Sequence, residues 1–441
     1  MNNLKAKRTR RIPVDAQWCI NNIDSLSPKS FFICNNHFER ASATRRYKLI
    51  VERWIDSGEK TRLLIDLAQW KKSEEAVSFW KERSIVLLLT ESETFVGVQN
   101  KAEEIICNIQ QQNRWMVNDV DITEIFFRYR SNIMDILNNN KDGIFLETRV
   151  LEIMGFIHVL FLAPEHSDVQ RNVFSEALLD EIYAAEIQKL MDKPLRPTSD
   201  MFLKQSHIIF DIEQKTTTIA KGAIMLTQVA YTAPYYEQRL LMGVARLMEE
   251  LPKKAVKNNQ IGEAELWGSF SHPLLAKILS DNERDIRSVT SGKFGASLGF
   301  GECKTSDKCS TASLCKDVIK LTQLAQRSIN INSIKSVFCF QIHGFTIAFY
   351  MANLSHEGVY TFTQLAKLEF PNSLEELPLF VNMKTISLLL QVSQCFWEHC
   401  YLQKQCLDLK TKMVQEVDHN VVNSLIHGSY NDARPCPINF K

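Results

Sequence analysis

Residues 285–304 read DIRSVTSGKFGASLGFGECK, and short apolar segments in this stretch alternate with glycine. The dipeptide Ser291-Gly292 predicts a turn. Residues i and i+2 of a strand point to the same face, so Glu302 and Lys304 are expected to project together. The turn could bring Asp285 back beside them. The stretch therefore predicts a hairpin that gathers two carboxylates and a lysine in one cleft.

This combination of side chains has a chemical logic. Two neighbouring carboxylates suit Mg²⁺, which keeps water and phosphate oxygens as its remaining ligands. A lysine beside them can orient or deprotonate the attacking water and stabilise negative charge on the phosphate. The pattern thus indicates a metal-dependent phosphodiesterase in which Glu302 and Asp285 bind the metal and Lys304 acts on the water.

The spacing alone also fits charged residues at a solvated strand end. The chain contains a second copy of the same pattern, in which Asp200 is followed by Glu213 and Lys215. This second copy also follows an apolar run, 207–210. Spacing alone therefore does not distinguish a functional site from a solvated strand end. The residues around each trio have to be compared.

The elements around residues 285–304 predict an α/β or α+β layer arrangement, not a bundle, behind a mostly helical N-terminal region. Helical spacing is found over 46–195 and over 216–252, with a break at Pro234. The later expectations are helices at 264–270, 274–280 and 311–328, strands at 336–343, 346–351 and 359–363, and a C-terminal helix opened by a capping box at 373–376.

The length of 441 residues favours two or three domains. The polar, charged residues 253–259 are the best candidate linker. The expected divisions are a polar basic arm (1–45), a mostly helical region (46–260), a core of helices and strands (261–400), and a helix end with a tail (401–441).

Composition and charge limit the class of protein. Hydrophobic residues make up 45%, which is enough for a sizeable core, and 52 Lys and Arg nearly balance 51 Asp and Glu. A net charge of +1 excludes a globally basic nucleic-acid coat. The longest apolar run, Ile153 to Ala163, is about half of the ~20 residues that span a bilayer. We expect a soluble intracellular protein with no secretory signal and no membrane partner.

The basic cluster from Lys5 to Arg11 has three interpretations. It is a nuclear-import signal, a phosphate contact, or simply a solvated arm.

The eleven cysteines predict reduced, mostly buried thiols, since no CxxC pair is present. A zinc site in the C-terminal helix is the alternative, because Cys395 and His399 would share a helix face.

Several segments resemble a group of uncharacterised fungal proteins whose core is similar to the PD-(D/E)XK, or restriction-endonuclease-like, nuclease superfamily. The resemblance spans about residues 261–400 and is carried by Glu263–Trp267, Phe294–Lys304, Leu314-Cys315, Phe340–Thr346 and Phe370–Pro378. It implies an α/β fold whose nuclease-like core is a mixed sheet flanked by helices. It also implies Mg²⁺-dependent hydrolysis of DNA, with Glu302 and Lys304 as the Glu-x-Lys pair and Glu265 (or Glu263) as an assisting helix glutamate.

One departure from the family affects the metal site. The usual Arg-Pro-Asp before the Glu-x-Lys strand is absent, and Glu283–Arg287 stands in its place in a segment that looks shortened. Either Asp285 fills the metal position or the position is empty. An empty position would leave a nuclease-like fold with poor metal affinity.

The helix after Glu302 carries a mostly basic stripe of Lys316, Lys320, Gln323 and Arg327. The three cations are candidates for contacts with DNA phosphates. Amphipathic helices also have charged outer faces without any ligand, and Asp317 interrupts this one.

Three functions follow from these patterns. The first is a Mg²⁺-dependent nuclease acting on DNA, or a degenerate relative. The second is a non-catalytic module that keeps the fold and binds nucleic acid or a protein. The third is a helical interaction protein in which residues 1–260 do the work.

Overall fold

The computed structural model describes residues 13–34, 40–77, 79–80, 114–139, 144–256, 261–280, 298–306, 309–401, 409, 412–414, 416–417, 419–427 and 436–440. The chain forms two compact units, residues 1–103 and 104–441.

The first unit is a small helical assembly. Phe31 and Phe32 are fully buried against Tyr47, with the ring centroids of Phe31 and Tyr47 5.2 Å apart. Residues 14–34 were expected in a polar arm, yet they form helices because these aromatic side chains provide a core. The basic cluster 5–11 lies outside the described residues. The helices are α1 (Val14–Asn21), η1 (Ile23–Ser25), α2 (Pro28–Cys34), α3 (Arg40–Trp54) and α4 (Ser57–Trp70).

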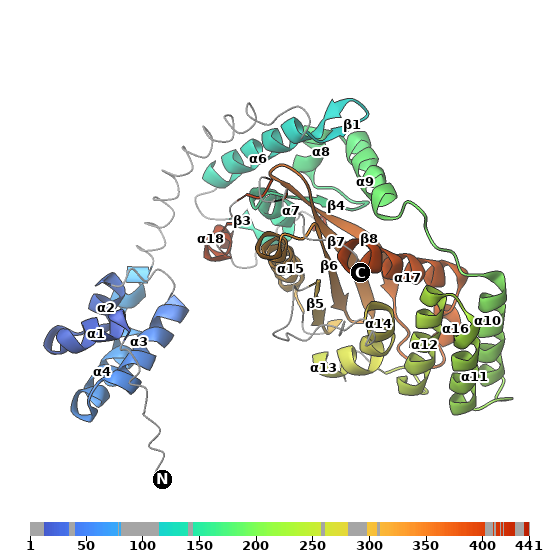
Figure 1. The fold of residues 1–441 in the computed structure, drawn as a ribbon. Helices are drawn as coiled ribbons and strands as arrows, with labels where there is room; N and C mark the ends of the chain where they lie inside the picture. Colours follow the sequence, from blue (N-terminus) through green and yellow to red (C-terminus); the bar gives the residue numbers. More distant parts are fainter. Residues whose placement is uncertain are drawn as a thin grey trace, which may run out of the picture. The chain divides into compact units, whose positions relative to one another are not determined.

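The second unit is an α/β fold built on a mixed five-stranded sheet, as the sequence predicted (Figure 1). The strand order is β4-β8-β7-β6-β5. The outer pairs β4·β8 and β5·β6 are parallel, and the inner pairs are antiparallel. The strands are β4 (Val159–Leu162), β5 (Gly299–Lys304), β6 (Ser336–His343), β7 (Thr346–His356) and β8 (Val359–Glu369).

Helices cover both faces of this sheet (Figure 1). One face packs on α7 (Leu146–Phe156) and α15 (Thr311–Asn332). The other face buries Phe338, Phe340 and Phe349 against α12 (Tyr235–Glu250), α14 (His272–Leu279) and α17 (Met383–Phe396). Two apolar layers therefore enclose β6 and β7, which explains why these strands lack polar alternation.

The remaining elements extend these layers. The helical stretch expected over 216–252 breaks at Pro234 as predicted, and Pro234 is the N-cap of the second of its two helices. The other elements are β1 (Met116–Val117), β2 (Val120–Asp121), α6 (Ile122–Asn139), β3 (Ile144–Phe145), α8 (Asp168–Phe174), α9 (Glu176–Leu190), α10 (Ser199–Glu213), α11 (Ile219–Thr232), α13 (Glu263–Glu265), the π-helical turns η4 (Leu266–Ser271) and η7 (Trp397–Tyr401), α16 (Leu377–Phe380), α18 (His419–Leu425) and β9 (Ile426–His427).

Two local expectations differ from the structure. The apolar run Ile153–Ala163 is not one helix, because it turns at His158 (φ +67°) and continues as β4. The predicted capping box at Ser373 is wrong. Asn382 caps the C-terminal helix by accepting a hydrogen bond from the Thr385 amide, at 2.9 Å.

Strand β4 lies on the N-terminal side of the boundary expected near residue 260, and it pairs with β8 on the other side. The sheet thus draws on both halves of the chain. None of the described helices combines the length and apolarity that crossing a bilayer requires.

Candidate functional site

The Glu-x-Lys pair lies on β5, which is the last strand at one edge of the described sheet. Glu302 pairs with Gln341 of β6, and the Gln341 side chain donates a hydrogen bond to the Leu314 carbonyl of α15 at 3.0 Å. Paired residues of neighbouring strands share a face, so Glu302 and Lys304 both project toward α15. Their common orientation is the one expected for residues i and i+2.

On the opposite face of β5, a glycine allows an aromatic ring to pack directly against the strand. A Cβ atom at Gly301 would lie 2.1 Å from the Phe340 ring, so only glycine leaves room for this ring. Phe340 in turn stacks on Trp267 of η4, with ring centroids 5.6 Å apart and an interplanar angle of 10°. This packing holds the short helix α13 beside the edge strand.

Helix α13 then supplies a carboxylate to the pair. The Lys304 ammonium lies 3.4 Å from Glu263 Oε1. The Cys303 thiol donates to the Glu263 carbonyl at 3.8 Å, which ties the same residue to β5. Glu265, the helix glutamate named first from the resemblance, is exposed and forms no ion pair within the described part of the chain. Of the two glutamates, the structure brings Glu263 to the lysine.

Helix α15 contributes two more charges. The Lys320 ammonium pairs with a carboxylate oxygen of Glu302, whose side chain is only 18% exposed. Asp317, one turn earlier, is 9% exposed, and its Oδ2 atom is buried without a hydrogen-bond partner among the described residues. The cluster consists of Glu263, Glu302, Lys304, Asp317 and Lys320.

The electrostatics of Asp317 reflect this crowding. Burial, and then the negative charge of Glu302, raise the pKa of the Asp317 carboxyl to about 6, although Lys304 and Lys320 oppose the shift. A carboxyl with a raised pKa beside a second carboxylate is a frequent feature of functional sites.

Lys304 is held in its charged form. Burial lowers the pKa of its ammonium group, but the carboxylates of Asp317, Glu263 and Glu302 outweigh this effect, and the pKa is raised overall. Lys304 is therefore a cation near neutral pH. It can donate hydrogen bonds to a water or a phosphate oxygen, and deprotonating the water is the less favourable role.

Whether a metal ion could bind here depends on the carboxylates that the structure brings together. Among the described residues, no group of three or more His, Cys, Asp or Glu side chains is arranged to hold a metal ion. Mg²⁺ commonly uses only one or two carboxylates together with water and phosphate oxygens. Glu302 and Asp317 are the two carboxylates from which such a site could be built, and Lys320 pairs with Glu302 in this structure. Asp285, the sequence's candidate for the second carboxylate, lies outside the described residues.

The helical spacing around Asp317 could have identified it as a buried residue from the sequence. Residue 317 follows the buried Leu314 by three positions and precedes the buried Leu321 by four, so helical spacing places it on the apolar face of α15. An aspartate at such a position is expected to be buried. Buried acidic residues are rare, so this one is a candidate for a functional role.

The basic stripe of α15 divides into two parts. Lys316 and Arg327 are exposed, whereas Lys320 engages Glu302. The Gln323 Oε1 atom accepts a hydrogen bond from His419 Nδ1 at 2.8 Å. The two exposed cations are thus available to an anion on the outer face of α15.

The second copy of the spacing is not a comparable site. Asp200 and Glu213 both lie on helix α10, near opposite ends, and Lys215 follows the helix in the left-handed region (φ +59°). All three side chains are exposed. No strand brings them together, so this copy shares only the order of an acidic residue followed by Glu-x-Lys.

The zinc alternative finds no support in the C-terminal helix. Cys395 is buried at 1% exposure, and the His399 Nε2 atom lies 2.9 Å from the Leu190 carbonyl. A histidine hydrogen-bonded to backbone in this way is a packing residue, as Trp397 is through its bond to the Ile278 carbonyl at 2.9 Å.

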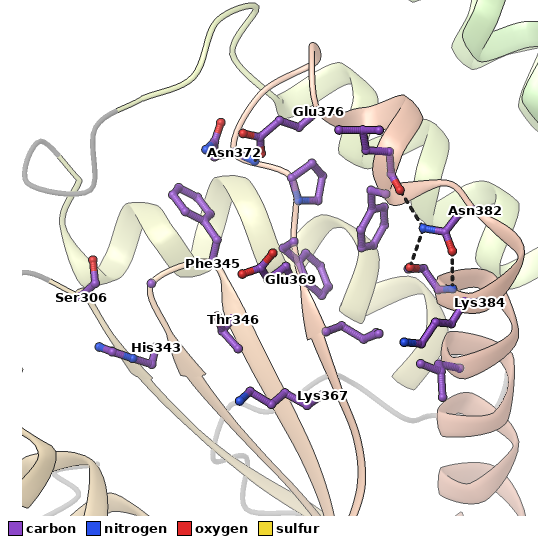
Figure 2. A pocket seen from close by; sticks show the side chains of 18 of the residues that line it. Ser306, His343, Phe345, Thr346, Lys367, Glu369, Asn372, Glu376, Asn382 and Lys384 are labelled. Carbon is purple, nitrogen blue, oxygen red and sulfur yellow. Dashed lines mark hydrogen bonds between the residues drawn. The ribbon is translucent and has the colours of Figure 1, made fainter. Parts of the chain in front are cut away.

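A cavity of about 800 Å³ opens at the end of the sheet that carries Lys304. Lys304 pairs with His343 in the sheet, and His343 and Ser306 both line the cavity. Figure 2 shows His343, Lys367 and Glu369 on the strand ends, with Lys384 on the helix opposite. Burial lowers the pKa of Lys367. The cavity has room for a polar ligand, and although it includes neighbours of Lys304 in sequence and in the sheet, its lining does not include the five cluster residues.

Comparison with protein-family models, curated proteins and solved structures found no match.

Proposed function

We propose that residues 104–441 hydrolyse DNA phosphodiester bonds with Mg²⁺, using a restriction-endonuclease-like core and the cluster around Glu302. The convergence of Glu302, Lys304 and Asp317 on one face of β5 and α15 carries this proposal. The mixed sheet with helices on both faces is consistent with the core that the resemblance of residues 261–400 implies.

Each side chain has a role in this mechanism. Glu302 and Asp317 would hold the metal, and Mg²⁺ when bound supplies positive charge that stabilises the negative charge developing on the phosphate. Lys304, kept protonated by its carboxylate neighbours, donates to the attacking water or to a phosphate oxygen. Glu263 positions the Lys304 ammonium from the side of α13.

The surroundings of the cluster favour an extended polyanion as substrate. Lys316 and Arg327 lie exposed along α15, and the 800 Å³ cavity begins at Ser306, two residues after Lys304. A DNA strand that passes Lys304 could therefore meet positive charge on α15 and enter the cavity.

The test is cleavage of supercoiled plasmid and of single-stranded DNA in Mg²⁺ by the full-length protein. We expect Lys304→Ala to lower the rate by about 10²–10³, the usual cost of losing one charge that stabilises a transition state. Lys215→Ala is the matched control, since Lys215 holds the same place in the second copy of the pattern, and it should cleave like wild type. Equal rates for wild type and Lys304→Ala would reject the proposal.

A second candidate is a non-catalytic DNA-binding module. The observation that favours it is the ion pair between Lys320 and Glu302, which occupies the carboxylate that the metal needs. In that case Mg²⁺ and Mn²⁺ would both fail to support cleavage at high protein concentration. DNA would still bind, and Lys316→Ala would weaken the binding.

A further inference from the structure

Two thiols from distant parts of the chain meet at the start of α15. The Sγ atoms of Cys315 and Cys436 are 3.6 Å apart, although 121 positions separate them in the sequence. Cys315 is fully buried, whereas Cys436 is half-buried and lines a second cavity, of about 370 Å³, with Arg149 and Glu152. One sulfur is therefore accessible to a small molecule and the other lies directly behind it.

Cys436 begins the short segment 436–440, which contacts strands β6 and β8 of the sheet. Its Phe440 carbonyl lies 3.3 Å from His343 Nδ1. Lys367 donates to the Asn439 carbonyl at 3.1 Å, and Ile438 is buried at 4% exposure. Phe440 also lines the 800 Å³ cavity. The segment thus forms part of the cavity wall beside the strand that pairs with β5.

We propose that Cys315 and Cys436 are a peroxide-sensitive thiol pair, and that the disulfide they form fixes residues 436–440 against the end of the sheet. This inference rests on the position of the two sulfurs and does not depend on the proposed hydrolysis of DNA.

The chemistry assigns a different role to each sulfur. The hydrogen bond between the thiols lowers the pKa of Cys436 and raises the pKa of Cys315. A thiolate is the reactive form of cysteine, so Cys436 attacks the peroxide, breaks the O–O bond and becomes a sulfenic acid while one water leaves. The Cys315 sulfur then attacks the Cys436 sulfur, the S–S bond forms and a second water leaves.

The balance is two thiols and one hydrogen peroxide giving one disulfide and two waters. The sulfur separation must shorten from 3.6 Å to about 2.05 Å, which a small shift of the terminal segment can provide. Cys339, Cys395 and Cys400 are buried in the core, where peroxide has poor access.

The test begins with reduced full-length protein and stoichiometric hydrogen peroxide. Remaining thiols are blocked after unfolding, and the protein is digested without reductant and analysed by mass spectrometry. We expect a linked peptide pair containing residues 315 and 436 to be the main product. Cys436→Ser should abolish it, and Cys309→Ser, which alters another half-buried thiol next to α15, should leave it unchanged.

Hydrogen exchange tests the structural consequence. Oxidation should slow amide exchange of residues 438–440 by about tenfold or more, and a dithiol should restore the faster exchange. If other disulfides form before the one between Cys315 and Cys436, these two residues are not the peroxide-sensitive pair. A 315–436 disulfide that leaves this exchange unchanged would overturn the fixing of the terminal segment.

Discussion

Asp317 is the residue whose chemistry differs most from its behaviour in water. Its pKa is raised from 3.8 to about 6 because burial and Glu302 disfavour the charged carboxylate. The folded chain therefore holds this proton over a pH range in which the unfolded chain releases it. Asp317 costs no stability below about pH 4, and its cost grows as the pH rises toward 6 and is constant above that.

We predict that Asp317→Asn removes this pH dependence. The stability of the variant relative to wild type should increase by about 1–3 kcal/mol between pH 4 and pH 7 in the absence of metal. Urea unfolding at several pH values measures the difference. Asp200→Asn, an exposed aspartate of α10 paired with Lys204, is the control and should show little change. An Asp317→Asn difference that is flat with pH would contradict the assigned pKa.

At the scale of an element, β5 depends on a glycine that packing requires. We predict that Gly301→Ala destabilises the fold by about 1–3 kcal/mol, because the added Cβ would overlap the Phe340 ring that stacks on Trp267. Gly268→Ala in η4 is the control, since an added Cβ there meets nothing within 4 Å. Thermal unfolding compares the two, and equal stabilities would show that the stacked rings do not fix β5.

On helix α15, the proposed phosphate contacts Lys316 and Arg327 are distinct from Asp317 and Lys320, which belong to the charged cluster. We predict that Lys316→Ala and Arg327→Ala each weaken DNA binding and each reduce the slope of log K against log salt by about 0.9. Their side chains are exposed on the helix surface. Fluorescence anisotropy at several salt concentrations measures the slope, with Lys221→Ala on α11 as the exposed control. Slopes identical to that of the control would exclude this face of α15 as a DNA contact.

At the scale of the whole molecule, all residues of the cluster belong to the second unit. We predict that a chain lacking residues 1–103 retains Mg²⁺-dependent cleavage at the wild-type rate. The rate per folded molecule, with folding checked by circular dichroism, is the measurement. Loss of activity from a folded fragment would favour the interpretation in which residues 1–260 do the work.

Several elements of the fold could be predicted from the sequence because the pattern of side chains within each element determines its secondary structure. The strand 336–343 and the apolar stripe of α15 follow from side-chain periodicity, and both are as expected. Strand β4 could not be predicted, since only pairing with β8, about 200 residues later, makes an extended conformation favourable for Val159–Leu162. Asp317 was missed as a neighbour of Lys304, and Glu263 was named only as the alternative to Glu265, because tertiary packing alone brings α13 and α15 to β5.

The most direct test of the catalytic account is the rate of Mg²⁺-dependent plasmid nicking by Glu302→Gln. This substitution preserves the size of the side chain and removes the charge that would bind the metal. We predict that nicking falls by about 10²–10³ in Glu302→Gln, whereas Glu213→Gln, which alters the corresponding glutamate of the second copy, nicks like wild type. Nicking by Glu302→Gln at the wild-type rate would contradict the catalytic account.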